Sequence, residues 1–350
     1  MIQRSFPFED WPVTDQALWR QIVRTGDILD GSGPGASWSP YTQANTRKAY
    51  AYWLFWLSNA GQLDPDTDPL DRITPIRVRA YLDSREDDIA PLTAFVYILD
   101  LLRLAQAPDK HRDWQWLKDI KNRLWARACP VRDKTSKIRP SSDLFELGRD
   151  LMAGADGITC PRNPLAAEVQ FRDGLIITIL AARPIRLKNL TAIEIGRQLV
   201  KIDAVYWLIF EAGEVKNAKS IEVSLPDVLT EFIDTYLVRH RRRLLQGRKT
   251  DRLWISRYAD PMAGNSIRGQ IKVRTEAVFG TALTPHLFRD CAATSIAIED
   301  PDHVRIAASI LGHHRLATTQ RYYDQSQMLA AGRHYQSALL ELRNAIKQGV

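Results

Sequence analysis

The sequence predicts two domains: an all-α first domain, and a mixed α+β second domain that is mostly helical and carries a small antiparallel sheet. Three observations lead to this fold class. The chain has 350 residues, about two domains at ~150 residues each. Helical hydrophobic spacing continues through residues 39–130, whereas short β-type apolar runs appear only after residue 190. Between them, residues 131–141 are basic and aperiodic, and we expect them to form a linker.

The first 38 residues end in the glycine- and proline-rich run Asp30–Gly35. Such a run disfavours regular structure. We therefore expect residues 1–38 to form a loosely ordered arm, with one short helix near residues 15–25.

Residues 39–130 carry four predicted helices. The first helix has apolar residues at i, i+3, i+4 and i+7, namely Tyr50, Trp53, Leu54 and Leu57. The second helix begins after Thr74, which is a typical N-cap residue and is followed by Pro75 at the first helical position. The four predicted helices cover residues 39–61, 75–82, 90–107 and 113–128.

The second domain, residues 142–350, mixes helix and strand patterns. Helices are predicted near residues 142–153 and 165–182. Short apolar runs then predict antiparallel strands at residues 193–195, 205–210 and 221–225. After Pro226 the pattern is helical to the end. The basic run Arg239–Arg243 is expected to be a solvated helix face rather than a DNA contact.

Composition excludes several classes of protein. Apolar residues make up 45% and charged residues 25% of the chain, which is globular composition. No apolar run approaches the roughly 18 residues of a membrane span, so we expect a soluble, cytoplasmic protein. The three cysteines lie far apart and favour neither a disulfide framework nor a zinc site. The net charge of +7, most of it in residues 140–350, favours an anionic partner.

Common catalytic motifs are missing from the sequence. It contains no phosphate-binding loop of the type GxxxxGK[ST] or GxGxxG, which disfavours nucleotide chemistry. It also lacks the motifs HExxH and GxSxG, which disfavours a zinc peptidase and a serine hydrolase. We therefore expect no metal and no other cofactor.

One ordered set of motifs stands out near the C-terminus. His286 and Arg289 form HxxR, His313 ends the tripeptide LGH, and Tyr322 ends the pentapeptide TTQRY. In this order and spacing the set resembles the tyrosine site-specific recombinases, the phage integrase family. The nine residues from His313 to Tyr322 match the family's interval, which selects Tyr322 over the adjacent Tyr323.

The resemblance continues upstream. Arg186, in the segment PIRLKNL, matches the arginine of the family's GLRISEL segment. Arg183 is the alternative match to the same arginine. Lys216 matches the family's hairpin lysine, with Lys219 as the neighbour that could be confused with it. In the first domain, Thr46, Tyr50 and Leu54 resemble the family's TxxxYxxxL helix.

Two positions depart from the family pattern. Asn189 stands where the family carries an acidic residue, and Asp290 stands where many relatives carry a second histidine. Neither position is expected to react directly with DNA.

The resemblance implies a chemistry that suits these residue types. Two guanidinium groups would bind the scissile phosphate bidentately, and the histidines would donate hydrogen bonds to it. The tyrosine would attack the phosphorus with help from a cationic pocket and from His286 as proton acceptor, and the lysine would protonate the leaving 5′-oxygen. The catalytic set implied is Arg186, Lys216, His286, Arg289, His313 and Tyr322.

The resemblance also implies partners. Residues 39–130 would be a DNA core-binding domain and residues 142–350 the catalytic domain of a clamp around duplex DNA. Four protomers would pair two sites and exchange strands through a Holliday junction, as in the integrases of mobile elements. Two alternatives stay open: a type IB topoisomerase-like or hairpin-telomere-forming enzyme, and a non-cleaving DNA-binding regulator of the same fold.

Three further segments are assigned to DNA or protein contacts. A helix opened by Asn265-Ser266 should bury Ile267, Ile271 and Val278. It should present Arg268, Gln270, Lys272 and Arg274 to the major groove, because arginine and glutamine read base edges bidentately. Lys134 and Lys137 of the linker are expected to follow the phosphate backbone. Residues 325–347 should form an amphipathic helix that docks on a neighbouring protomer or on its own domain.

Overall fold

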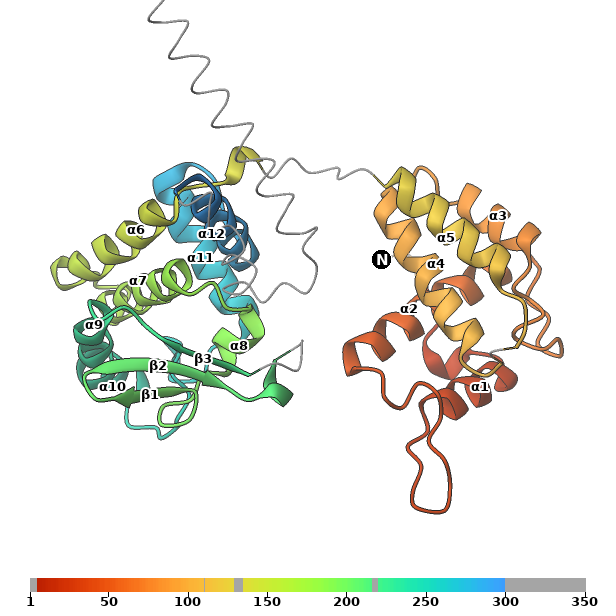
Figure 1. The fold of residues 1–350 in the computed structure, drawn as a ribbon, viewed down its shortest axis with the longest axis horizontal. Coiled ribbons are helices and arrows are strands. Elements are labelled where there is room, and N and C mark those ends of the chain that lie inside the picture. Colours follow the sequence, from red (N-terminus) through yellow and green to blue (C-terminus); the bar gives the residue numbers. More distant parts are fainter. Residues whose placement is uncertain (1–4, 110, 129–134, 216–219, 300–350) are drawn as a thin grey trace, which may run out of the picture. The chain divides into compact units, whose positions relative to one another are not determined.

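The computed structural model describes residues 5–109, 111–128, 135–215 and 220–299 (Figure 1). The chain divides into two compact units between residues 133 and 134, within the predicted linker. Each unit has its own cluster of buried apolar side chains. No helix among the described residues is long and apolar enough to cross a membrane.

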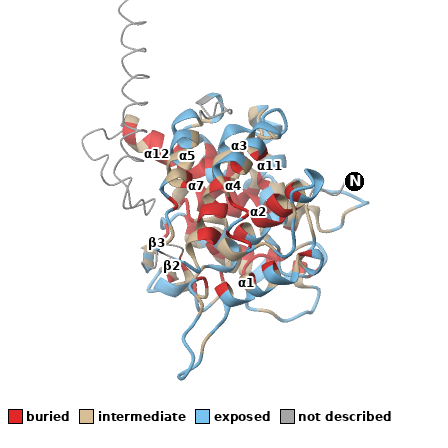
Figure 2. Ribbon diagram, turned by 90° about the vertical axis from the view of Figure 1, so that its right-hand side faces the viewer, coloured by how far each residue is buried: buried red, intermediate tan, exposed pale blue. Residues whose placement is uncertain are grey.

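The first unit is all-helical, as predicted. Tyr50, Trp53, Leu54 and Leu57 are each at most 1% exposed, so the predicted apolar face is the buried one (Figure 2). Thr74 caps its helix as expected, since its side chain accepts a hydrogen bond from the backbone N–H of Arg77. The helices are α1 (Val13–Val23), α2 (Pro40–Asn59), α3 (Pro75–Asp83), α4 (Pro91–Gln106) and α5 (Gln115–Arg127), with a 3₁₀ turn at Phe8–Asp10.

The short helix predicted near residues 15–25 is confirmed as α1, but the segment that carries it is not the loose arm that we predicted. Helix α1 buries Trp19 and Ile22 in the core of the first unit. Asp15 is fully buried and forms an ion pair with the equally buried Arg72, with 2.7 Å between Oδ2 and Nη1. The hydroxyl of Tyr50 donates a second hydrogen bond to Asp15, at 2.5 Å. The prediction was wrong because the glycine-rich run marks only the loop after α1, whereas α1 itself is an integral element of the domain.

The second unit is mostly helical and carries one small sheet, which agrees with the predicted α+β class. Helix α7 is its centre: five of its apolar residues between Leu175 and Leu180 are at most 1% exposed. The helices are α6 (Ser141–Ala153), α7 (Ala166–Ala182), α8 (Leu187–Ala192), α9 (Leu229–Thr235), α10 (Arg241–Leu245), α11 (Gly264–Phe279) and α12 (Pro285–Glu299). A π-helical turn, Tyr236–His240, joins α9 to α10.

The sheet has three antiparallel strands in the order β1-β2-β3. Strands β2 (Val205–Phe210) and β3 (Ile221–Ser224) lie where strands were predicted, and β2 alternates between buried and half-buried residues. The strand predicted at residues 193–195 is wrong. The chain turns at Gly196, which has a φ of +80°, so this segment makes only isolated bridges, and β1 forms later, at Leu199–Ile202.

The C-terminal part is also less helical than predicted. Residues 246–263 form a non-helical excursion between α10 and α11. The guanidinium of Arg241 fixes the first part of this segment by donating hydrogen bonds to the backbone carbonyls of Thr250 and Arg252. Two backbone carbonyls of this segment are thus satisfied by a side chain, and others bond backbone N–H groups outside any helix, such as that of Ile195 to Asp251 O.

The second half of the predicted linker belongs to the second unit. The backbone N–H of Arg139 donates to Cys291 Sγ at 3.4 Å, and that of Ser141 donates to Ser295 Oγ at 2.9 Å. Both acceptors lie on α12. Burial raises the pKa of Cys291 to about 11, so its thiol stays protonated here.

Candidate active site

Arg186 lies on a short turn between the buried helix α7 and the partly buried helix α8. Helix α7 ends at Ala182, and Arg186 is the N-cap residue of α8, half-buried, with extended backbone angles. The indole N–H of Trp254 donates a hydrogen bond to the carbonyl of Leu190 in α8 at 2.9 Å, and this bond fixes the helix that follows the turn. Helix α8 therefore fixes the position from which the Arg186 side chain extends.

Helix α12 brings the second predicted arginine to the same turn. Arg289 is buried, with 8% of its surface exposed, and its Nη1 donates to the carbonyl oxygen of Pro184 at 2.5 Å. Pro184 lies two residues before Arg186. The fold thus joins two segments that are about a hundred residues apart in sequence.

His286 lies one helical turn before Arg289 on α12. Residues at i and i+3 share one face of a helix, so the imidazole and the guanidinium project to the same side. His286 is exposed, whereas Arg289 and Asp290 are buried. This arrangement places an accessible imidazole beside a buried cation.

Arg183, the sequence competitor of Arg186, has a different partner. Its Nε donates to the carbonyl of Ser224 at 3.1 Å and so ties the end of α7 to strand β3. This hydrogen bond gives Arg183 a structural role.

Asn189, which departs from the family pattern, is 3% exposed. Its amide nitrogen has no hydrogen-bond partner among the described residues. The side chain lines a cavity of about 250 Å³ together with Lys188, Glu194 and Glu214. The position therefore keeps an unused donor directly behind the turn that carries Arg186.

Three of the six predicted catalytic residues lie outside the described residues: Lys216, His313 and Tyr322. The neighbouring Tyr323, Lys134 of the linker and the predicted helix at residues 325–347 also lie outside them. The segment of Lys216 follows Val215 and precedes β3, which is the connection in which the sequence comparison placed it.

The predicted DNA-reading helix forms as α11, beginning one residue earlier than expected. Arg268 and Lys272 are exposed, Gln270 is half-buried, and Lys137 of the linker is exposed. Arg274 instead turns inward, where its Nε bonds Asp173 at 3.0 Å. The carboxylate of Asp173 also bonds Arg172, so Arg274 belongs to a buried ion-pair network that sequence reasoning missed.

The inward packing predicted for Val278 is wrong. Val278 is 60% exposed, and Phe279 packs against the core in its place. The buried positions Ile267, Ile271 and Thr275 recur every four residues, and Phe279 continues that row.

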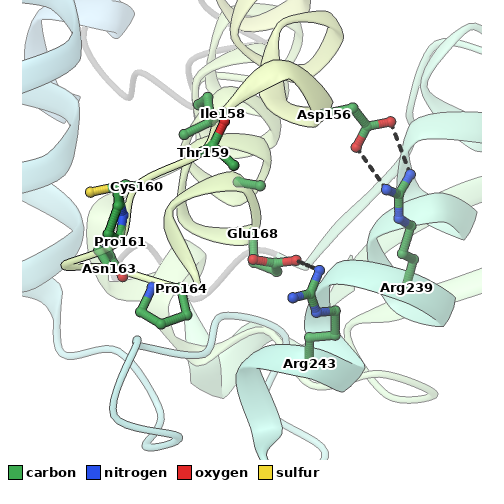
Figure 3. Close-up of a pocket in the computed structure, with 11 residues that line it drawn as sticks. Asp156, Ile158, Thr159, Cys160, Pro161, Asn163, Pro164, Glu168, Arg239 and Arg243 are labelled. Carbon is green, nitrogen blue, oxygen red and sulfur yellow. Dashed lines mark hydrogen bonds and ion pairs between the residues drawn. The ribbon is translucent and has the colours of Figure 1, made fainter.

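The basic run Arg239–Arg243 is only in part the solvated face that we predicted: Arg239, Arg242 and Arg243 are exposed, whereas His240 and Arg241 are buried. Arg239 makes a two-point ion pair with Asp156, and Arg243 Nη1 lies 2.5 Å from an oxygen of the buried Glu168 (Figure 3). These four side chains line a cavity of about 380 Å³. His240, between the two arginines, is 1% exposed and stacks on Phe171 at a ring distance of 4.0 Å. Arg239 and Arg243 therefore face solvent and also form ion pairs, with Asp156 before α7 and with Glu168 in its first turn.

Comparison with known proteins finds a family match within the second unit. Residues 161–328 match the model of the phage integrase family. This match covers slightly less than half of the chain, and the matched part is similar to the tyrosine recombinases. The matched range contains all six residues of the predicted catalytic set. Among the described residues, no group of three or more His, Cys, Asp or Glu side chains is placed to hold a metal ion.

Curated relatives support the same family. Over 153 residues the chain is 29% identical to tyrosine recombinase XerD of Staphylococcus saprophyticus and 30% identical to XerD of Staphylococcus haemolyticus. Each alignment covers 43% of this chain and 50% of the relative. The chain thus spans about half the length of the curated relatives it matches.

Solved structures share the tyrosine recombinase fold. XerH recombinase bound to its difH substrate aligns with a TM-score of 0.56 at 16% identity, over 83% of this chain and 78% of that chain. A lambda integrase dimer bound to a core site aligns with a TM-score of 0.51 at 16% identity, over 82% of this chain and 90% of that chain. At these identities the likeness concerns the fold.

Proposed function

We propose that this chain is a site-specific DNA recombinase that cleaves and rejoins DNA strands through a 3′-phosphotyrosyl intermediate. The observation that supports this most directly is the hydrogen bond from Arg289 to the carbonyl of Pro184, which brings the second arginine to the turn of the first. Two guanidinium groups on one turn suit a phosphodiester, whose transition state gains charge on its non-bridging oxygens. The family match covers the range in which the remaining predicted catalytic residues lie, which supports the proposal.

In this proposal the phenolic oxygen of Tyr322 attacks the scissile phosphorus. The bond between phosphorus and the 5′-oxygen breaks, Lys216 supplies the proton to that oxygen, and His286 accepts the proton of the phenol. Arg186, Arg289 and His313 hold the non-bridging oxygens. The phosphotyrosyl bond conserves the energy of the phosphodiester, so a 5′-hydroxyl of the partner strand can reverse the step without ATP or metal.

Double-stranded DNA is the proposed partner, and the first unit is the proposed core-binding domain. The related XerH and lambda integrase structures hold DNA, which supports this assignment. Exposed Arg268 and Lys272 of α11 are proposed DNA contacts, with Gln270, Lys134 and Lys137 beside them. Arg274 is left out, because its guanidinium bonds Asp173. A homotetramer on paired sites in the cytoplasm completes the proposal.

The test is covalent capture. Protein–DNA adducts resistant to SDS are recovered from cells that express the chain, and the attached DNA is sequenced to build a nicked suicide duplex. We expect Tyr322→Phe to abolish the adduct while DNA binding and melting temperature stay unchanged, because only a hydroxyl is removed. Tyr323→Phe is the matched control and should still cleave. An adduct on Tyr323, or an unchanged adduct in Tyr322→Phe, would contradict the assignment.

The same duplex separates the alternatives. A recombinase joins the cleaved strand to a second duplex, whereas a type IB topoisomerase-like enzyme reseals it to itself and a hairpin-forming enzyme joins the two strands of one end. Binding to the site without any adduct would indicate a regulator of the same fold.

A further inference from the structure

The loop after α1 is a built projection. Residues 24–35, which we call the finger, extend from one end of the first unit (Figures 1 and 2). Backbone hydrogen bonds close its base, from Gly33 N–H to Arg24 O and from Gly35 N–H to Ile22 O, both at 2.8 Å. The guanidinium of Arg24 also donates to Gly31 O at 2.9 Å.

Glycine is required within the finger. A Cβ on Gly26 would lie 2.0 Å from Asp30 O, and one on Gly33 would lie 2.2 Å from Gln21 O. Backbone segments therefore approach here more closely than any side chain allows. The finger has a specified shape that its sequence maintains.

The tip of the finger is apolar and bare. Ile28 is 101% and Leu29 is 93% exposed, the two highest values among the large apolar side chains of the described residues. Removal of such apolar surface from water is favourable. Two such residues in sequence, at the end of a closed projection, indicate insertion into an apolar surface.

Acidic groups flank the tip. The carboxylate of Asp27 accepts hydrogen bonds from the backbone N–H groups of Leu29 and Asp30, at 2.8 Å each. These bonds lower the pKa of Asp27, with the bond from Asp30 as the largest cause. The tip is thus anionic, which disfavours the DNA backbone as its occupant and favours an apolar surface with a basic rim.

A surface of that kind lies at the opposite end of the same unit. We call it the patch: Leu92, Phe95 and Val96 of α4 with Trp125 of α5. The rings of Phe95 and Trp125 lie 5.0 Å apart, and Trp125 is 60%, Leu92 47% and Val96 37% exposed. The rim is basic, since Lys121 and Lys118 lie one and two turns before Trp125 on the same face of α5.

We propose that the finger of one copy of this chain docks on the patch of a second copy. Apolar tip meets apolar patch, and Asp27 and Asp30 meet the lysines of α5. Within one chain the two surfaces lie at opposite ends of the first unit (Figure 1), so the contact forms between copies. The contact is head-to-tail, because it joins two different surfaces. In a pair of copies, one finger and one patch therefore stay free to bind further copies.

The test measures self-association of the chain in the absence of DNA. Sedimentation velocity is recorded at protein concentrations between about 10 and 200 μM, the range in which a weak interface dissociates. We expect the sedimentation coefficient of the wild type to rise with concentration. Leu29→Asp in the finger, and Trp125→Asp or Lys121→Glu in the patch, should each abolish the rise. Ile76→Asp is the control: Ile76 is 82% exposed on α3, outside both surfaces, and its substitution should leave the rise intact.

A mixture of two variants tests directly whether the finger binds the patch. The Leu29→Asp chain keeps its patch and the Lys121→Glu chain keeps its finger, so an equimolar mixture should form a two-chain species and nothing larger. A wild type that stays monomeric, a Leu29→Asp chain that associates like the wild type, or a mixture that stays monomeric would overturn the proposal. Because no DNA is present, the result is independent of the proposed recombinase activity.

Discussion

The guanidinium of Arg289 serves two purposes at once, and this explains why arginine suits the position. One of its nitrogens donates to the carbonyl of Pro184. A guanidinium is a planar fork with five N–H donors, so one side chain can bond several acceptors in a fixed geometry, whereas an ammonium is a single point charge. A buried cation fixed to the turn of Arg186 is thus preorganised before any substrate arrives.

We expect Arg289→Lys to retain the charge and lose cleavage. A lysine cannot bond Pro184 O and a phosphate oxygen in the same geometry, and the loss of one transition-state donor costs on the order of 10²–10³ in rate. The measurement is the rate of covalent adduct formation on the suicide duplex. Arg149→Lys is the matched control, because Arg149 is exposed on α6 and lies outside the proposed catalytic and DNA contacts; this variant should cleave at the wild-type rate. Equal losses in both variants would mean that arginine geometry at Arg289 is not special.

His240 should make the second unit sensitive to acid. Burial lowers its pKa below the usual value of 6.5, and the charges of Arg239 and Arg243 lower it further, against the opposing charges of Glu168 and Asp156. Neither ring nitrogen has a hydrogen-bond partner among the described residues. The unfolded chain therefore binds the proton more tightly, and stability falls as the pH drops below 6.5.

The expected loss at pH 5.5 is at most about 1.4 kcal/mol relative to pH 7.5, measured as the shift in urea midpoint. His240→Phe keeps the stack on Phe171 and removes the proton site, so its midpoint should fall less. The exposed His111 provides the control, since His111→Gln should fall as the wild type does. A wild type with equal midpoints at both pH values would contradict this assignment.

At the scale of elements, the ion pair between Asp15 and Arg72 attaches α1 to the first unit. Both side chains are fully buried, and Arg72 also donates to the carbonyl of Thr67 at 2.6 Å. A helix fixed by a buried, hydrogen-bonded charge pair is part of the cooperative unit rather than an appendage.

Removal of one partner should therefore be strongly destabilising. Asp15→Asn leaves the Arg72 charge buried and uncompensated, at a cost of about 3–5 kcal/mol in the free energy of unfolding. Urea denaturation of the full chain measures it through the transition of the first unit. Asp10→Asn, at an exposed position in the preceding turn, should change the midpoint little; similar midpoints for both variants would place α1 outside the folding unit.

At the scale of the whole molecule, the net charge of +7 lies mostly in the second unit. A protein that neutralises phosphates releases counterions, so the affinity should fall with a log–log slope of about −0.9 per phosphate. We expect the double variant Arg268→Ala, Lys272→Ala to weaken binding and reduce that slope by about 2. Fluorescence anisotropy at several salt concentrations measures the slope, and an unchanged slope would remove α11 from the DNA interface.

Much of this protein follows from short-range pattern. The helices of the first unit and the strands β2 and β3 were predicted from periodicity, caps and turn residues, because such signals span only a few residues. The motif positions from Arg186 to Tyr322 were predicted from the resemblance to the tyrosine recombinases. The predicted roles of Lys216, His313 and Tyr322 remain predictions, since these residues lie outside the described part of the chain.

The remaining features depend on partners distant in sequence. Asp15 finds Arg72, Arg274 finds Asp173, and Arg289 finds Pro184 only after the chain has folded. For the same reason α1 became a core helix and the run Arg239–Arg243 became a set of ion pairs. A charged side chain in a sequence predicts solvent exposure unless a buried opposite charge or carbonyl meets it, and only the tertiary structure decides where those partners lie.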